Sequence, residues 1–289
     1  MPKVASRRVA SAPSASLDEK PSAAELKGEK SNQQFVTALA RGIAILRCFS
    51  ATRTELGTME IAQMTGLPQP TVWRLCNTLQ ELGCITPAPY SGKLQVGMGL
   101  LGLGFSALSS VDITDLALAE MHTIAEDFGA AVSLTIAEPL EMLIVKRAQG
   151  NGTLVANLNP GSRISMATSA AGWAYLASLS EEARTPVLRR LEAYHRDKWT
   201  AIKGAIDNGR QEYDKLGFTL NVGVFHPDIN SVAVAVRDMQ GAPIYVLNGG
   251  GAATVLPVTK LREEIAPRLK LLANRMQAAL TAKAASSAR

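Results

Sequence analysis

MTGLPQPTVWRLCNTLQELG, residues 64–83, places two prolines directly ahead of a strongly helical run. Proline is tolerated in the first turn of a helix, where its missing N–H would have no intrahelical partner, so Pro70 is expected to open a helix near Gln69. Apolar residues then recur at helical spacing and predict one buried face, made of Val72, Leu75, Cys76, Leu79 and Leu82. The other face is polar and able to form hydrogen bonds.

A shorter helix precedes this one. Thr58 is expected to cap it and Gly66 to end it. Two helices joined by a tight glycine turn are typical of the helix-turn-helix, whose second helix enters the major groove of DNA. A helical hairpin inside a bundle would show the same spacing. Earlier still, FVTALARGIAILRCFSA (residues 35–51) predicts a third helix whose apolar stripe is Leu39, Ile43, Leu46 and Phe49.

The segment after the long helix, CITPAPYSGKLQVG (residues 84–97), reads as two short extended runs around a turn. Three helices followed by such a hairpin predict a winged helix-turn-helix, with Lys93 near the tip of the wing to meet a phosphate. The residues expected to face DNA are Gln69, Pro70, Thr71, Trp73, Arg74, Asn77 and Lys93.

The run LPQPTVWRLCNTLQELGCI (residues 67–85) resembles the recognition helix of the IclR family of bacterial transcription regulators. Gln69 and Pro70 stand where that family most often has a basic residue and a serine, which implies a different base preference. The resemblance implies a sequence-specific regulator, repressor or activator, that binds a double-stranded DNA operator as a homodimer or a dimer of dimers. It also implies control of a catabolic operon.

Length and composition set wider bounds. A chain of 289 residues with 47% hydrophobic and 19% charged residues suggests two domains of ordinary composition. No apolar run reaches the roughly 18 residues of a membrane span. The three cysteines lack metal-ligand spacing, which favours a cytoplasmic location and small buried thiols. The net charge of +5 permits DNA binding, but the motif carries that prediction.

The expected domains are a disordered tail (1–33), a winged helix-turn-helix (34–96), a linker helix (97–111) and a C-terminal domain (112–285). GMGLLG, residues 97–102, matches the G-x-G-x-x-G nucleotide motif literally. No βαβ unit surrounds it, so it is interpreted as the start of the linker helix. The apolar surface of that helix suggests dimer contacts.

The C-terminal half alternates between strands and helices. Strands are expected at AVSLTIA (131–137), MLIVKR (142–147), NSVAVAVRD (230–238) and APIYVLNGGG (242–251). Helices are expected between the two hairpins and after Thr259. The fold class is therefore α+β, with an antiparallel sheet in the C-terminal domain.

Residues 160–180 and 215–238 resemble the IclR effector-binding domain, a GAF-like fold. Asn221 occupies a usually acidic position of that family, and Ser231 a usual cysteine. The resemblance implies that the effector is bound by Ala167, Thr168, Ser169, Asn221, Ser231, Asn248 and Gly250. Because Asn221 removes a negative charge, a small organic acid is the expected effector. Alternatively, Asn221 and Asn248 only fix loop backbones.

Two other functions remain as alternatives: a DNA-binding regulator without a ligand, and an enzyme carrying a DNA-binding module. Catalysis needs a nucleophile with a base, a metal site or a cofactor cradle. The chain has three histidines and neither G-x-S-x-G nor H-E-x-x-H. The sequence therefore predicts no enzyme activity, cofactor or metal.

Overall fold

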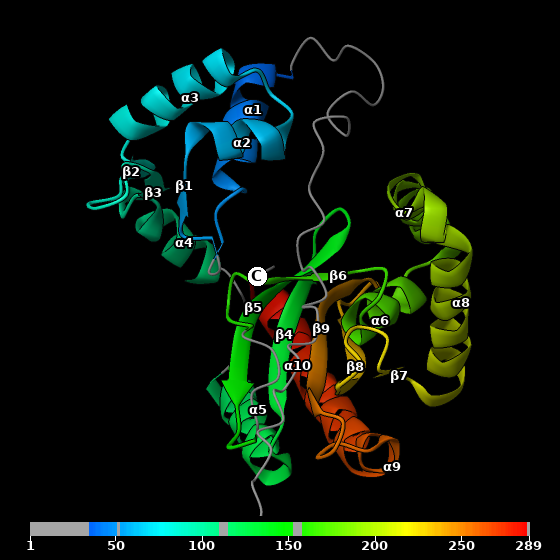
Figure 1. Cartoon of the computed structure of the whole chain (residues 1–289). Coiled ribbons are helices and arrows are strands. Elements are labelled where there is room, and N and C mark those ends of the chain that lie inside the picture. Colours follow the sequence, from blue (N-terminus) through cyan, green and yellow to red (C-terminus); the bar gives the residue numbers. More distant parts are fainter. Residues whose placement is uncertain (1–34, 51–52, 110–114, 153–157, 288–289) are drawn as a thin grey trace, which may run out of the picture. The chain divides into compact units, whose positions relative to one another are not determined.

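A computed structural model describes residues 35–50, 53–109, 115–152 and 158–287. The predicted tail, 1–33, lies outside these residues, as do the last two residues of the predicted linker helix. The chain divides into two compact units, with the boundary between Phe105 and Ser106. Figure 1 shows the elements of each unit in sequence colours. Among the described helices, none combines the length and apolar content that crossing a bilayer requires.

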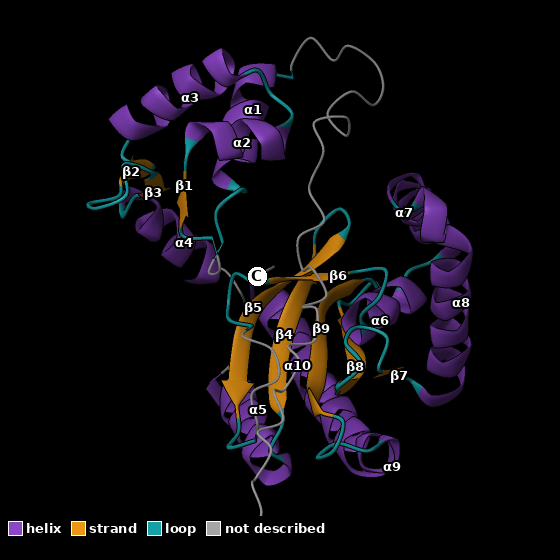
Figure 2. Ribbon diagram, viewed as in Figure 1, coloured by secondary structure: helices purple, strands orange, loops and turns teal. Residues whose placement is uncertain are grey.

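The first unit is a winged helix-turn-helix, as the sequence predicted (Figure 2). Its three-stranded antiparallel sheet has the order β1-β3-β2. Its elements are α1 (Thr37–Leu46), β1 (Glu55–Leu56), α2 (Thr58–Thr65), α3 (Gln69–Glu81), β2 (Ile85–Pro87), β3 (Leu94–Val96) and the first part of α4 (Gly99–Ser109), which continues past the boundary.

The predicted apolar stripe of α1 is wrong in part. Gly42 and Ile45 are the buried residues of α1, whereas Leu39 and Ile43 are exposed. The helix is rotated from the expected orientation because Ile45, with Cys48 just beyond the helix, fills the small core against α2 and α3. In α3, Val72, Cys76 and Leu79 are buried as predicted. Leu82 is exposed because the helix has already ended at Glu81.

The start of α2 also differs from the prediction. Gly57, not Thr58, is the N-cap residue, and Thr58 is the first residue of the helix. The Glu60 carboxylate reaches back and accepts a hydrogen bond from the Gly57 N–H at 2.6 Å, which satisfies a donor at the helix start. Gly66 ends the helix with φ of 66°, a left-handed conformation that glycine adopts without strain.

The second unit is an α+β domain built on a six-stranded antiparallel sheet, in the order β6-β5-β4-β9-β8-β7. The short edge strands β6 and β7 were not predicted. Its strands are β4 (Ala131–Ala137), β5 (Glu141–Gln149), β6 (Arg163–Ser165), β7 (Thr219–Val222), β8 (Ile229–Arg237) and β9 (Pro243–Ala252). Its helices are α5 (Asp115–Phe128), α6 (Ala170–Ser178), α7 (Glu181–Tyr194), α8 (Trp199–Leu216), α9 (Val258–Lys260) and α10 (Ala266–Ser287).

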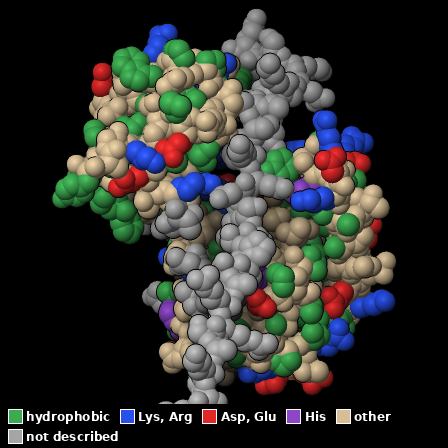
Figure 3. All heavy atoms as spheres, viewed as in Figure 1, with side chains coloured by type: hydrophobic (Ala, Val, Ile, Leu, Met, Phe, Trp, Pro, Cys, Tyr) green, Lys and Arg blue, Asp and Glu red, His purple; other side chains and the backbone are tan. Residues whose placement is uncertain are grey.

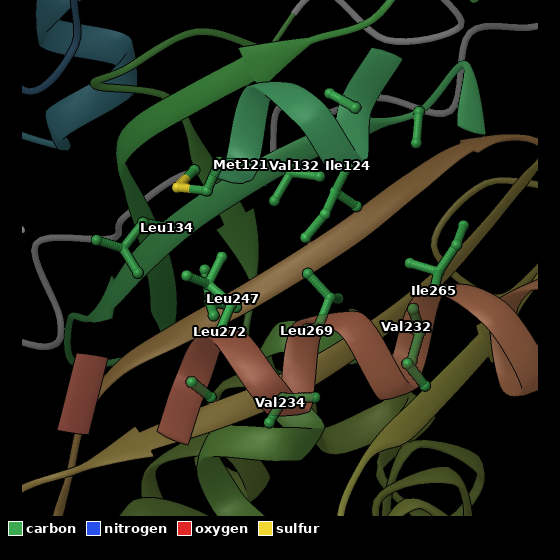
Figure 4. Packing of buried hydrophobic residues seen from close by; sticks show 14 of the residues in the cluster. Met121, Ile124, Val132, Leu134, Val232, Val234, Leu247, Ile265, Leu269 and Leu272 are labelled. Carbon is green, nitrogen blue, oxygen red and sulfur yellow. The ribbon is translucent and has the colours of Figure 1, made fainter. Parts of the chain in front are cut away.

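Helices cover both faces of this sheet. Val232 and Val234 of β8 face one way and pack with α5 and α10, where Leu269 and Leu272 point toward the strands (Figure 4). Ala233 belongs to the opposite cluster, which contains α6 and α8. The predicted alternation of β8 is therefore confirmed. Both faces of the strand are buried, so each face belongs to its own hydrophobic core.

The glycines of the G-x-G-x-x-G match have a packing explanation. A Cβ added at Gly97 would lie 2.2 Å from the Gly83 carbonyl oxygen, and one at Gly99 would lie 2.8 Å from the same atom. These two glycines let the chain after β3 pass directly against the end of α3. Gly102, the last glycine of the match, has open space around its Cβ position.

Gly97→Ala is therefore expected to destabilise the first unit by about 1–3 kcal/mol, because backbone must move to relieve the clash. Gly102→Ala, in the same motif, should be neutral or stabilise by up to about 1 kcal/mol by removing helix-interior glycine. Amide hydrogen exchange of peptides from α3 and α10 would measure both units in one full-length sample. Equal protection of α3 in the two variants would contradict this account.

Candidate functional site

The polar face of α3 is presented to solvent in the first unit. The helix begins at Gln69, with Pro70 in its first turn as predicted. Arg74 lies two residues from both Val72 and Cys76, which is about 200° around the helix from each buried side chain. Arg74 therefore projects from the side of α3 opposite the core. Pro70 and Trp73 are exposed as well, with 57% of Trp73 accessible.

A groove runs between α3, the start of α2 and the wing. Four of the predicted DNA-facing residues line it: Gln69, Trp73, Asn77 and Lys93. Thr71 and Arg74 lie outside its lining, and Thr71 is only partly exposed. The structure thus brings part of the predicted set together beside the wing and leaves Arg74 on the outer side of the helix.

Lys93 lies in the loop that joins β2 to β3, directly after the turn at the tip of the wing, as predicted. Its carbonyl accepts a hydrogen bond from the Ala88 N–H and so closes the loop between the end of β2 and the start of β3. Its ammonium forms an ion pair with Glu60 at 3.0 Å. Because the same carboxylate holds the N–H of Gly57, Glu60 ties the wing to the start of α2. Lys93 thus has a positioning role that the sequence did not reveal.

The second unit contains a polar pocket on the α6 side of its sheet. Adjacent strands place residues in two rows. In the first row Arg147 of β5 is opposite Ser133 of β4, which is opposite Asn248 of β9. Two residues further along, and so on the same face, Ala131 is opposite Gly250. In the same second row Ser231 of β8 is the other neighbour of Gly250.

Four of the predicted effector-binding residues line this pocket: Ser169, Ser231, Asn248 and Gly250. Within the described part of the chain, the Ser231 hydroxyl and the Asn248 amide make no hydrogen bond, so both are available to a ligand. The Ser169 hydroxyl caps α6 by accepting from the Gly172 N–H at 3.1 Å.

The other three predicted residues hold the pocket's surroundings in place and do not line it. Asn221 is fully buried; its amide donates to the Thr168 carbonyl at 2.7 Å and its oxygen accepts from the Phe225 N–H at 3.0 Å. An aspartate here would offer no donor to Thr168. The Ala167 carbonyl accepts from the Trp173 ring N–H at 2.8 Å. Asn221 therefore fixes loop backbones, which was the alternative expectation.

The glycines of β9 give the pocket its depth. A Cβ at Gly250 would lie 2.8 Å from Cβ of Ser231. On the other face, a Cβ at Gly249 would lie 3.2 Å from Ile265, and one at Gly251 would lie 3.1 Å from Leu256. These glycines are thus enclosed by neighbouring strands and helices, and the pocket is lined by two of them, Gly250 and Gly251.

Sequence reasoning missed several lining residues. Arg147 and Gln149 come from β5, Phe225 from the loop before β8, and Leu158 and Ile164 from the segment around β6. Burial lowers the pKa of the Arg147 guanidinium below its ordinary value. The one available signal was the pair of cations, Lys146 and Arg147, that follows the apolar run of the strand MLIVKR.

An exposed recognition helix beside a wing, joined to an α+β unit with a polar pocket, defines a DNA-binding transcriptional regulator. Family models support this class: the IclR helix-turn-helix domain matches residues 38–89, and the bacterial transcriptional regulator IclR C-terminal domain matches residues 105–277. The chain belongs to the IclR family. Its relatives are regulators, not enzymes.

Individual relatives agree with this assignment. The HTH-type transcriptional regulator TsaQ1/TsaQ2 of Comamonas testosteroni is 29% identical over 88% of this chain and 92% of its own. The crystal structure of an IclR-family regulator from Brucella abortus is 37% identical, covers 87% of this chain and 95% of its own, and has a TM-score of 0.78. A Microbacterium hydrocarbonoxydans homologue, crystallised with 4-hydroxybenzoate, shares the fold at 20% identity (TM-score 0.60, covering 84% and 98%).

The two hydrogen-bond donors that contact the Glu60 carboxylate lower its pKa, so their contribution to stability depends on pH. The Gly57 N–H first, and the Lys93 ammonium second, hold the pKa of Glu60 below its ordinary 4.5. Because the folded pKa is depressed, this stabilisation is present above pH 4.5 and is lost as pH falls through the folded value. In Lys93→Met the Glu60 pKa should rise but stay below 4.5, since the Gly57 bond remains.

NMR titration of the Glu60 side-chain carboxyl carbon in the full-length protein would measure this. Lys203→Met, which removes the lysine paired with Asp207 on α8, is the matched control and should leave Glu60 unchanged. A wild-type Glu60 pKa at or above 4.5 would show that the carboxylate does not hold these two donors.

Proposed function

We propose that this protein binds a double-stranded operator sequence-specifically as a homodimer and that a small organic acid in the pocket of the second unit changes its operator affinity. Such regulators suit the control of a catabolic operon, because the acid to be degraded can signal its own presence. The observation that carries the proposal is the pairing, in one chain, of an exposed recognition helix with a pocket in which Ser231 and Asn248 make no side-chain hydrogen bond to any described residue.

The DNA-binding part rests on α3. Helix-turn-helix proteins place the N-terminal residues of this helix against base edges in the major groove, which fits the exposed Gln69 and Arg74. Arginine pairs bidentately with guanine, and glutamine with adenine. Trp73 offers an apolar surface to a thymine methyl group. The wing, held by the Glu60–Lys93 pair, would then approach the phosphate backbone.

Self-association is supported by exposed apolar surface on the first unit. Leu39 and Ile43 of α1 are exposed, and so are Leu101, Leu103 and Phe105 of α4. In Figure 3, hydrophobic side chains gather over the wing and α4. Apolar side chains that gather on a surface, as those over the wing and α4 do, are typical of protein interfaces. A two-fold dimer would place two recognition helices on a pseudo-palindromic operator, with half-sites about one helical turn apart.

The effector part rests on the pocket. Ser231 and Asn248 offer donors and acceptors that no described side chain or backbone group engages, which suits a ligand that carries oxygen atoms. The homologue crystallised with 4-hydroxybenzoate gives a precedent for such a ligand on this fold. A ligand shifts operator affinity only if it binds the DNA-competent and DNA-incompetent states differently, typically by about 1–3 kcal/mol.

The role of Arg74 can be tested on an operator selected from random duplex DNA with the full-length protein. Arg74→Ala should cost about 1–3 kcal/mol of discrimination at one base pair of each half-site, because a bidentate contact is lost. Arg189→Ala, which removes an exposed arginine of α7, is the control and should bind like wild type. Unchanged affinity and base preference in Arg74→Ala would show that α3 does not read bases through this residue.

The pocket can be tested by titrating operator binding with small carboxylic acids, 4-hydroxybenzoate among them. Asn248→Leu keeps roughly the size of the side chain but removes its polar groups, so it should abolish the response and leave ligand-free DNA binding near wild type. Asn208→Leu on the exposed side of α8 is the control. An unchanged response in both Asn248→Leu and Ser231→Ala would refute this pocket. Failure of wild type to respond to any acid would favour a ligand-independent regulator.

A further inference from the structure

One charge dominates the pocket. Of the described residues that line it, Arg147 alone can ionise. Its Nη1 donates to Ser133 Oγ at 3.0 Å, and its Nη2 donates to Gln149 Oε1 at 3.0 Å. Both partners are neutral. A guanidinium carries five N–H donors, so these two bonds leave three for other acceptors.

No carboxylate offsets this charge within the described part of the chain, where Arg147 forms no ion pair. Residues 153–157, between β5 and Leu158, lie outside the described part of the chain. Their sequence, TLVAN, contains no acidic residue. Partly buried charges in proteins are normally paired, because transfer out of water is costly. The lowered pKa of Arg147 reflects that cost. An anionic ligand would supply the missing partner.

The strand register shows where the rest of such a ligand would lie. Ser133 sits between Arg147 and Asn248 in the first row, so the Cα atoms of Arg147 and Asn248 are about 10 Å apart, two strand spacings. The second row has the small residues Ala131 and Gly250 at its centre, and these leave a hollow. Leu158, Ile164 and Phe225 give the hollow apolar walls.

We propose that Arg147 binds the carboxylate of the effector and thereby restricts the pocket to monocarboxylates with a compact apolar body, such as an aromatic ring. Ser133 and Gln149 hold the guanidinium in position for this contact. A neutral amide of the same shape would leave the cation unpaired, and a second carboxylate would find no second cation among the described lining residues. This assignment rests on the proposed effector pocket and names its ligand class.

Calorimetric titration of the full-length protein with benzoate and with benzamide, which has the same shape without the charge, tests the assignment. Wild type should bind benzoate at least tenfold more tightly than benzamide. Arg147→Met keeps the side-chain stem and removes the charge, so it should lose the preference while binding benzamide much as wild type does. Arg147→Lys keeps the charge without the planar fork and should keep a reduced preference.

Lys146→Met is the matched control. Lys146 is the adjacent cation on β5, but it is opposite Leu134 and so belongs to the other face of the sheet. This variant should retain the wild-type preference. Three results would overturn the assignment: equal binding of benzoate and benzamide by wild type, no benzoate binding at millimolar concentration, or an undiminished preference in Arg147→Met.

Two further measurements separate the possible failures. If circular dichroism shows that Arg147→Met is unfolded, Arg147→Lys tests the assignment instead. That variant must bind benzoate more weakly than wild type while still preferring benzoate to benzamide. Ligand-free operator binding tests the regulator function independently. A protein that prefers benzoate through Arg147 but binds no operator would refute the proposed function and leave this assignment standing. If benzamide changes operator affinity as much as benzoate does, the Arg147 assignment is refuted and the proposed regulator function stands.

Discussion

The pairing of β4 with β9 is the constraint on which the second unit depends. These strands lie side by side at the centre of the sheet although Thr135 and Val246, joined by a buried hydrogen bond of 3.2 Å, are 111 positions apart. The register sends Leu134 and Leu247 toward α10 and sends Ser133 and Asn248 toward the pocket. A slip of one residue would exchange the two faces, exposing the core and burying the polar row.

The sequence predicted elements well where the signal is local and strongly periodic. The recognition helix, β4 and β8 were all predicted, because proline placement and alternation act within a few residues. One error arose where packing against distant residues decides, and another where a local contact competes with the expected one. The orientation of α1 is set by Ile45 packing against other helices, and the cap of α2 by Glu60 reaching back to Gly57. Short edge strands such as β6 carry too little pattern to predict.

The pocket residues also divide into those that the sequence predicted and those that only the folded structure reveals. Ser231 and Asn248 could be predicted because they occupy motif positions in a family resemblance, whereas Arg147 could not, since its neighbours are known only once β5, β4 and β9 are in register. For Asn221 the sequence left two roles open, ligand contact and the fixing of loop backbones, and the structure favours the second. The two hydrogen bonds of Asn221, to Thr168 and Phe225, join the start of α6 to the loop before β8, and no local pattern indicates such a link.

The enclosed glycines of β9 limit how this binding site can diverge during evolution. Gly250 cannot gain even a methyl group without displacing Ser231, and Gly249 and Gly251 are confined from the opposite face by Ile265 and Leu256. This glycine stretch of β9 is therefore closed to stepwise substitution. Descendants of this chain can acquire new ligands through the other lining positions, where a single base change alters size or charge without disturbing the sheet.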